Sequence, residues 1–196
     1  MAYIANTAFE ARITNNSRDN LSHIAGKYFV GDTETDCSAG LLCTRDSLLP
    51  NEGYANVNNE NTWKMVAAAA TANADTGVYA CDTYDNQLLS APNGNNYFIG
   101  TATLGLGAPA GRYCNFTRIN FDGDSVYRFG VGNASASVGN NQYFTIANGL
   151  LVPAAAAPTT VGAVYFKLRG TGKFVEGNMQ SFDYIDVVAC KVSAAA

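Results

Sequence analysis

Short apolar stretches rich in Val, Ile, Tyr, Phe and Thr recur along this chain, and short polar segments separate them. Gly, Asn, Asp or Pro bounds each stretch, which is the pattern of a β-strand rather than of a helix. The pattern predicts strands over residues 27–30, 62–69, 77–84, 97–104, 112–121, 125–131, 142–146, 161–168 and 184–192. We therefore predict an all-β fold, an antiparallel β-sandwich or barrel with hairpin connections.

Turn residues support hairpins in the second half of the chain. Asn93-Gly94 and Asn148-Gly149 are Asn-Gly pairs, which tolerate a positive φ and suit two-residue hairpin loops. One stretch competes for helix, because residues 65–74 read MVAAAATANA and alanine is the best helix former. Its flanks are β-like and no capping box precedes it, so we predict a strand that runs into a loop.

The first 25 residues show no clear period, because their apolar side chains are spread among Asn, Ser and Arg. We predict an extended N-terminal arm over residues 1–25 that orders against a partner, with an edge strand plus a short helix as the alternative. Residues 26–196 then form a single β-rich domain. Two lobes divided near residues 76–95 are the alternative for this domain.

Charged residues are scarce, and this changes the expected function. They make up 14% of the chain, against about 25% in ordinary globular proteins. Small neutral polar groups cost less to desolvate than Lys or Glu, so such a surface suits extensive protein contact. The net charge is −4 and the 12 basic residues are scattered, which argues against nucleic acid as a partner.

Five cysteines, an odd number without a CxxC pair, favour free buried thiols in a reducing cytosol. The N-terminal residues lack the basic and apolar regions of a signal peptide, and the longest apolar runs are too short to cross a bilayer. We therefore expect synthesis in the cytoplasm and no membrane partner.

Candidate chemistry is sparse. His23 is the single histidine, and we interpret it as a solvent-facing or interface residue. Two acidic clusters have oxygen ligands of the kind that Ca²⁺ prefers, but solvated turn residues are the simpler interpretation of both. These clusters are Asp32, Glu34 and Asp36 in one case, and Asp122 and Asp124 in the other. We predict no catalytic residue, no cofactor and no metal, and hence a protein that is not an enzyme.

Aromatic residues fall in adjacent or alternating pairs on the predicted strands. Neighbouring strand residues point to opposite faces, so we expect each pair to place one ring outward. Outward aromatic rings are common in interfaces, and we assign Tyr97, Tyr127 and Tyr143 to self-association. A sugar-binding face that uses Trp63 and exposed tyrosines is the main alternative.

Residues 77–192 carry a resemblance in the segments GVYACDTYDNQLL, NYFIGTATLGL, SVYRFGVGN, NQYFTIANGLLVPAAAAPTTVGAVYFKL and FDYIDVVACKV. In its order of strand, Asn-Gly turn, strand, small-residue loop and strand, this region resembles the small head decoration (cement) proteins of tailed bacteriophages. The resemblance implies a protein that is added to the outside of an expanded icosahedral capsid, often as a homotrimer. It also implies the major capsid protein of the same virus as partner.

The predicted function is therefore a virion structural protein that stabilises the capsid exterior by non-covalent binding. For capsid contact we predict the N-terminal arm, with Tyr3, Ile4 and Phe9 as anchors. The hairpin tips around Asn93 and Asn148 are the alternative contact points. A carbohydrate-binding or adhesin-like β-sandwich and a phage tail component are the alternative functions.

Overall fold

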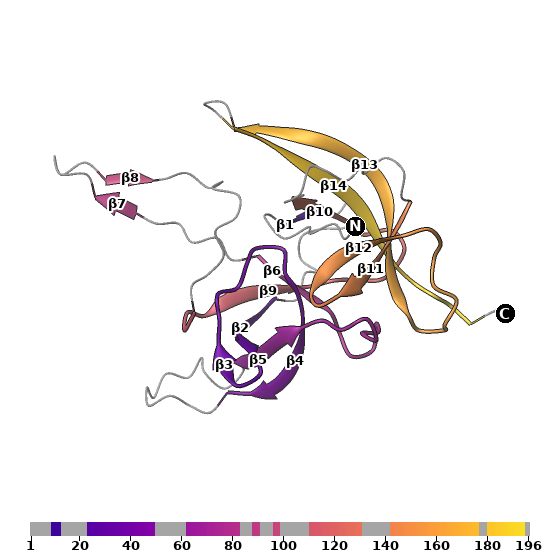
Figure 1. Cartoon of the computed structure of the whole chain (residues 1–196), viewed down its shortest axis with the longest axis horizontal. Helices are drawn as coiled ribbons and strands as arrows, with labels where there is room; N and C mark the ends of the chain where they lie inside the picture. The colour runs from indigo at the N-terminus through magenta and orange to yellow at the C-terminus, as the bar shows by residue number, and fades with distance from the viewer. Residues whose placement is uncertain are drawn as a thin grey trace.

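The computed structural model describes residues 9–12, 23–49, 62–82, 88–90, 96–98, 110–130, 142–176 and 180–194. These residues form fourteen strands and no helix, so the prediction of an all-β fold is confirmed. Within these ranges there is accordingly no helix of the length and apolarity needed to span a membrane. Two larger layers, a barrel and a sheet, make up most of the described chain (Figure 1).

The first layer is a closed barrel of five strands. In order around the barrel the strands are β2 (His23–Val30), β5 (Trp63–Ala67), β4 (Leu42–Leu48), β6 (Tyr79–Cys81) and β9 (Cys114–Arg118). Pairing between β2 and β9 closes the barrel, and the short β3 (Thr33–Glu34) pairs with β2. One barrel pair, β2 with β5, is parallel, whereas we expected antiparallel neighbours throughout.

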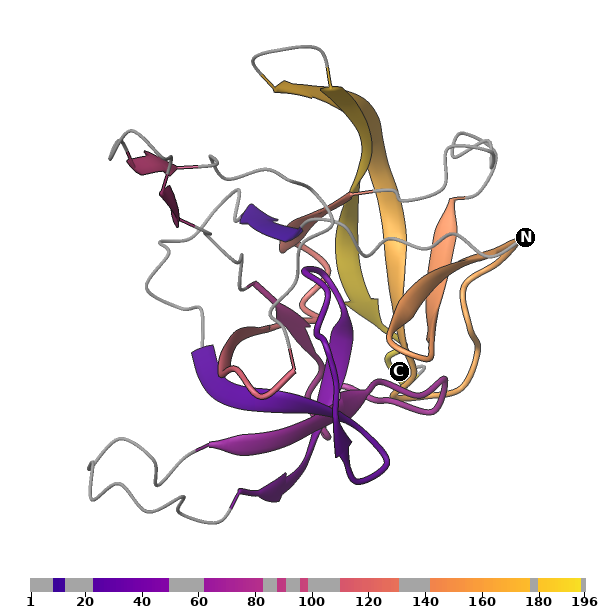
Figure 2. The ribbon, with the colours of Figure 1, turned by 60° about the vertical axis from the view of Figure 1, so that its left-hand side comes forward.

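The second layer is an antiparallel six-stranded sheet (Figure 2). Its strands are, in spatial order, β1 (Phe9–Arg12), β10 (Val126–Gly130), β14 (Gln180–Lys191), β13 (Val164–Glu176), β11 (Tyr143–Ala147) and β12 (Leu150–Ala154). Two short strands, β7 (Leu88–Ser90) and β8 (Asn96–Phe98), form a separate hairpin.

Each of the nine predicted strands overlaps an observed one, whereas β1, β3, β4, β7 and β12 were not predicted. The alanine-rich stretch forms a strand that ends at Ala67 and continues into turns, which confirms the prediction of a strand running into a loop. The chain passes from barrel to sheet between Arg118 and Val126, later than the 76–95 region in which the sequence suggested a division.

Two parts of the expected N-terminal arm lie in sheets. Residues 9–12 form the edge strand β1, in which Phe9 pairs with Phe129 of β10, and residues 23–25 begin β2 of the barrel. Tyr3 and Ile4 lie outside the described residues.

A hydrophobic core joins the two layers. Phe166 lies at its centre, with the ring of Phe121 at 5.6 Å and that of Phe129 at 6.0 Å, both edge to face. The barrel contributes Leu42, Ala68, Val78 and Ala80 to the same cluster. Because the layers bury one another's apolar faces, each layer alone would expose its part of this shared core to water.

The β11–β12 hairpin tip connects the layers a second time. Asn148 and Gly149 both have positive φ, 50° and 75°, as a two-residue hairpin requires. The Gly149 N–H donates to the carbonyl of Ala68, the Gly149 carbonyl accepts from the Leu42 N–H, and both bonds are 2.9 Å long. A Cβ at Gly149 would lie 2.8 Å from the Leu42 oxygen, so only glycine fits at this junction.

Candidate functional site

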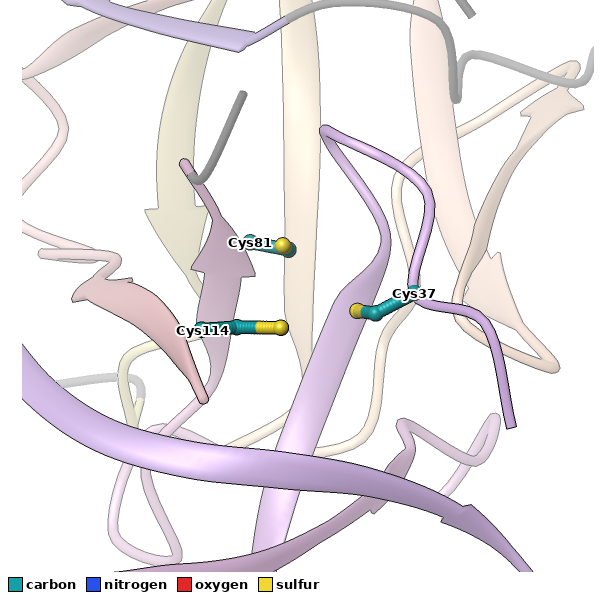
Figure 3. A group of neighbouring side chains, drawn as sticks. All are labelled: Cys37, Cys81 and Cys114. Atoms are coloured by element: carbon teal, nitrogen blue, oxygen red, sulfur yellow. The ribbon is translucent and has the colours of Figure 1, made fainter. Parts of the chain in front are cut away.

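Four of the five cysteines lie in the interior of the barrel, and three of them converge. The Sγ atoms of Cys37, Cys81 and Cys114 all lie within 4.8 Å of one another, and Figure 3 shows the three side chains pointing toward one another. Cys43 belongs to the same buried cluster. All five cysteines are free in this structure, and Cys190 is only partly buried whereas the other four are buried.

Strand register and backbone hydrogen bonds fix the three converging side chains. Cys81 on β6 pairs with Phe116 on β9, and Cys114 lies two residues before Phe116, on the same inward face. Cys37 comes from the segment between β3 and β4. The Gly40 N–H donates to the Cys81 carbonyl at 2.7 Å and the Cys81 N–H donates to the Leu41 carbonyl at 3.0 Å, which ties this segment to β6.

Hydrogen bonds among the thiols shift their acidity in opposite directions. Hydrogen bonds from Cys37 and Cys81 lower the pKa of Cys114 to about 4, although burial acts the other way. The same contact with Cys114 raises the pKa of Cys37 and the pKa of Cys81. These pKa shifts make Cys114, which lies between Cys37 and Cys81, the most acidic thiol of the three. Thiolates in this arrangement can bind a soft metal ion or be oxidised.

His23 is exposed, in agreement with a solvent-facing residue, and it also belongs to a small polar group at the end of the barrel. Its Nδ1 is 3.0 Å from the hydroxyl oxygen of Thr117 and 3.3 Å from a carboxylate oxygen of Asp82. The Thr117 hydroxyl donates to Asp82 and is 1% exposed. Because that hydroxyl is buried and already bonded, this group is suited to joining β2, β6 and β9 rather than to attacking a substrate.

The first acidic cluster does not converge. Asp32 binds Lys64 at 2.9 Å and Glu34 binds Lys27 at 3.3 Å. Asp36 accepts a hydrogen bond of 2.7 Å from the backbone of Ala110. The three carboxylates thus serve three different partners.

Asp122 of the second acidic cluster closes its own turn. One carboxylate oxygen accepts from the backbone N–H groups of Asp124 and Ser125 at 2.9 and 2.7 Å. The other accepts from the Ser125 hydroxyl at 2.6 Å. These hydrogen bonds occupy carboxylate lone pairs that would otherwise bind a Ca²⁺ ion. The geometry is therefore that of a side-chain-stabilised turn and not of a calcium site.

The outward placement expected for Tyr127 was wrong. Its side chain is completely buried in the core between the layers, where its hydroxyl accepts a 2.8 Å hydrogen bond from the backbone N–H of Asn120. Tyr127 and Phe129 are two residues apart on β10, so they share one face, and that face is the core. Tyr127 therefore cannot serve self-association.

The remaining predicted aromatic contacts differ in exposure. Tyr143 is half-buried on the outer face of the sheet, 6.1 Å from the ring of Tyr165. Trp63 packs against the cysteine-containing cluster, with the guanidinium of Arg45 4.8 Å from its ring centre. The side chains of Tyr97 and Phe9 and the whole of Asn93 lie outside the described residues.

The β13–β14 hairpin is the most extended feature of the sheet. We call the four pairs from Lys173↔Asp183 to Glu176↔Gln180 the free end of the hairpin, since no other described strand pairs with them. In Figures 1 and 2 this end projects from the body of the molecule. Among the described residues, its two outer backbone edges are therefore unpaired.

A side-chain clamp fixes the base of the free end. The Arg128 guanidinium binds the Asp186 carboxylate through two bonds of 2.8 Å each and lies 3.6 Å from the centre of the Tyr184 ring. The Tyr184 ring in turn lies over Gly172, where a Cβ would collide with it. Such planar, bidentate contacts hold orientation well, so the hairpin leaves the sheet in a defined direction.

The chain matches no protein-family model, no curated protein and no solved structure. Its function must therefore be inferred from its own sequence and geometry.

Proposed function

We propose that this chain is a virion structural protein that decorates the outside of a phage capsid and stabilises it by non-covalent binding of many copies. The observation that carries the proposal is the free end of the β13–β14 hairpin, held in one direction by the Arg128 clamp. The proposed partners are the major capsid protein of the same virus and further copies of this chain in a homotrimer.

The free end has the chemistry of a docking element. A two-stranded ribbon is marginally stable alone in water, and its open edges can add to a strand of another chain through backbone hydrogen bonds. Because Arg128, Asp186 and Tyr184 already fix its base, little orientational freedom is lost on binding.

Surface composition supports a large protein contact. Only 14% of the residues are charged, so burying this surface removes few ions from water. That is a property of a protein that works within an assembly, and it agrees with the resemblance to head decoration proteins.

The mechanism is thermodynamic and needs no reaction. A protein that binds the expanded lattice but not the immature one stabilises the expanded state by mass action. Many copies on one shell multiply a modest local energy. The capsid would thereby resist the pressure of packaged DNA.

Co-sedimentation with capsids of the virus that encodes the chain tests the proposal. The full chain should bind expanded shells and ignore immature ones. Replacing residues 174–182 with Asn-Gly, a two-residue turn between the paired Lys173 and Asp183, should abolish binding. Deleting residues 1–8 is the matched control, since it removes the predicted anchors Tyr3 and Ile4 but leaves β1.

The outcomes separate the alternatives. Failure of the intact chain to bind either shell would refute capsid decoration, and a ring-shaped oligomer would indicate a tail component. Loss of binding on deletion of residues 1–8, with the shortened hairpin still active, would move the contact to the N-terminal arm.

A carbohydrate-binding module is the second candidate, and one groove favours it. The groove of about 610 Å³ is lined by Tyr165, Asp124, Lys167 and Arg169 among others, and Tyr143 lies beside Tyr165. Aromatic rings next to charged hydrogen-bonding groups suit a sugar. Binding on a glycan array that is lost in Tyr165→Ala would support this function over decoration.

A further inference from the structure

We propose that Cys37, Cys81 and Cys114 bind one Zn²⁺ ion inside the barrel, with Cys43 as the fourth ligand. The site goes beyond the proposed function and does not depend on it. It rests on the convergence of three buried sulfurs, which reach one point from a loop, from β6 and from β9.

The spacing of the sulfurs is close to that of a zinc centre. With Zn–S bonds of about 2.3 Å, a tetrahedral site places its sulfurs about 3.8 Å apart. The three Sγ atoms lie within 4.8 Å of one another, so inward side-chain movements of about an ångström or less would form the site. Cys43 belongs to the same buried cluster, but its sulfur is not among the three that lie within 4.8 Å of one another, so a larger side-chain movement would be needed to bring in this fourth sulfur.

The donor set selects the class of metal. Only sulfur ligands converge here, and thiolates favour zinc and other soft metals over Mg²⁺ or Ca²⁺. In the binding reaction, one Zn²⁺ ion and four thiols give one zinc tetrathiolate and release four protons. No oxidant or reductant takes part.

The surrounding barrel suits a structural rather than a catalytic ion. Apolar and aromatic residues enclose the sulfurs, namely Leu41, Met65, Tyr79 and Phe116. All four cysteines are buried, so a four-sulfur site would leave no position for a substrate. The ion would join β4, β6, β9 and the segment around Cys37, which are far apart in sequence.

Cobalt substitution tests the site directly. The full chain, purified under reducing conditions, is titrated with Co²⁺ and then with Zn²⁺. We expect one equivalent of Co²⁺ to give thiolate-to-cobalt charge-transfer bands and the visible bands of tetrahedral cobalt, and one equivalent of Zn²⁺ to remove both. Metal analysis of the untreated protein should find about one zinc per chain, and a chelator should lower its melting temperature.

Matched cysteine variants locate the ligands. Cys81→Ser and Cys114→Ser should lose the cobalt spectrum. Cys190→Ser should keep it, because Cys190 lies in the sheet and bonds weakly to the Val188 carbonyl. The titration of the wild-type protein remains informative even if one of these variants does not fold.

Two results would overturn the proposal. The first is a wild-type protein that gives no cobalt spectrum while all its thiols react after unfolding, which would make the cluster a packed core of free thiols. The second is an intact mass lower by two hydrogen atoms per chain, which would indicate a disulfide within the cluster instead.

Discussion

The barrel and the free end of the β13–β14 hairpin differ in whether their strand edges are paired. In the barrel, pairing of β2 with β9 closes the ring, and a closed ring leaves no edge for another chain. In the free end, residues 173–176 and 180–183 pair only with each other among the described residues. In the function proposed above, these two parts have different roles: the barrel and the core beneath it stabilise the chain, and the free end of the hairpin is the proposed contact with partners.

A single strand contains both kinds of position, which gives the sharpest test of this division. Phe166 and Lys173 both lie on β13, but Phe166 is in the core between the layers and Lys173 is in the free end. We expect Phe166→Ala to lower the free energy of unfolding by ~3–5 kcal/mol. Lys173→Ala, at an exposed site, should change it by less than about 0.5 kcal/mol. Chemical denaturation measures both, and equal losses would refute the division.

The contact of the β11–β12 tip with the barrel can be separated from simple backbone strain. Gly149 and Gly162 have similar positive φ values, 75° and 83°, but a Cβ has open space at Gly162 and collides with Leu41 and Leu42 at Gly149. Gly162→Ala should cost ~1–2 kcal/mol of unfolding free energy from φ alone. Gly149→Ala should cost a further ~1–3 kcal/mol. Similar costs would mean that the tip does not dock tightly.

Two tyrosines on the sheet should respond differently to loss of their hydroxyl groups. Tyr127→Phe leaves the part-buried Asn120 N–H without its acceptor, so we expect a loss of ~1–2 kcal/mol in thermal or chemical unfolding. Tyr143→Phe keeps the half-exposed ring and should change stability by less than ~0.5 kcal/mol. If Tyr127→Phe left stability unchanged and Tyr143→Phe lowered it, the assignment of Tyr127 to the core and of Tyr143 to the outer face would be wrong.

The turn that links barrel to sheet should give the smallest effect, and it depends on pH. Burial raises the pKa of Asp122, but hydrogen bonds from Ser125 and Asp124 outweigh it, so the pKa is lower than in the unfolded chain. The stabilisation is therefore present above the unfolded pKa of about 3.9 and is lost as pH falls through the folded value.

Asp122→Asn keeps the hydrogen-bond acceptor for the two backbone N–H groups but removes the charge. Its melting temperature should thus fall less steeply than that of the wild type as the pH drops below about 4. Parallel curves for the two proteins would contradict the assignment.

Most strand positions could be predicted from the local pattern of apolar and polar residues. Strands were missed where that pattern was interrupted. β4 was missed because the apolar residues of LCTRDSL do not alternate, and β12 because it contains Pro153. Proline is tolerated there because β12 is the edge of its sheet. Tyr127 was misplaced because alternation was applied to residues two apart, which share a face.

The sulfur cluster could not be predicted from spacing. Cys37, Cys81 and Cys114 are separated by more than 30 residues each. The pairing of β6 with β9 and the backbone bonds of residues 40 and 41 to Cys81 bring them together, and these long-range contacts are set by tertiary packing. The burial of thiols was predictable, because unpaired cysteines favour the interior.

Hydrogen exchange of the free and the capsid-bound protein tests the central claim most directly. In the free protein we predict slow exchange for barrel amides such as Leu42 and Cys81, and fast exchange at residues 173–176 and 180–183. On binding to expanded capsids, new protection should appear at the free end and leave the barrel unchanged. New protection confined to the barrel, with the free end still exchanging fast, would contradict the account.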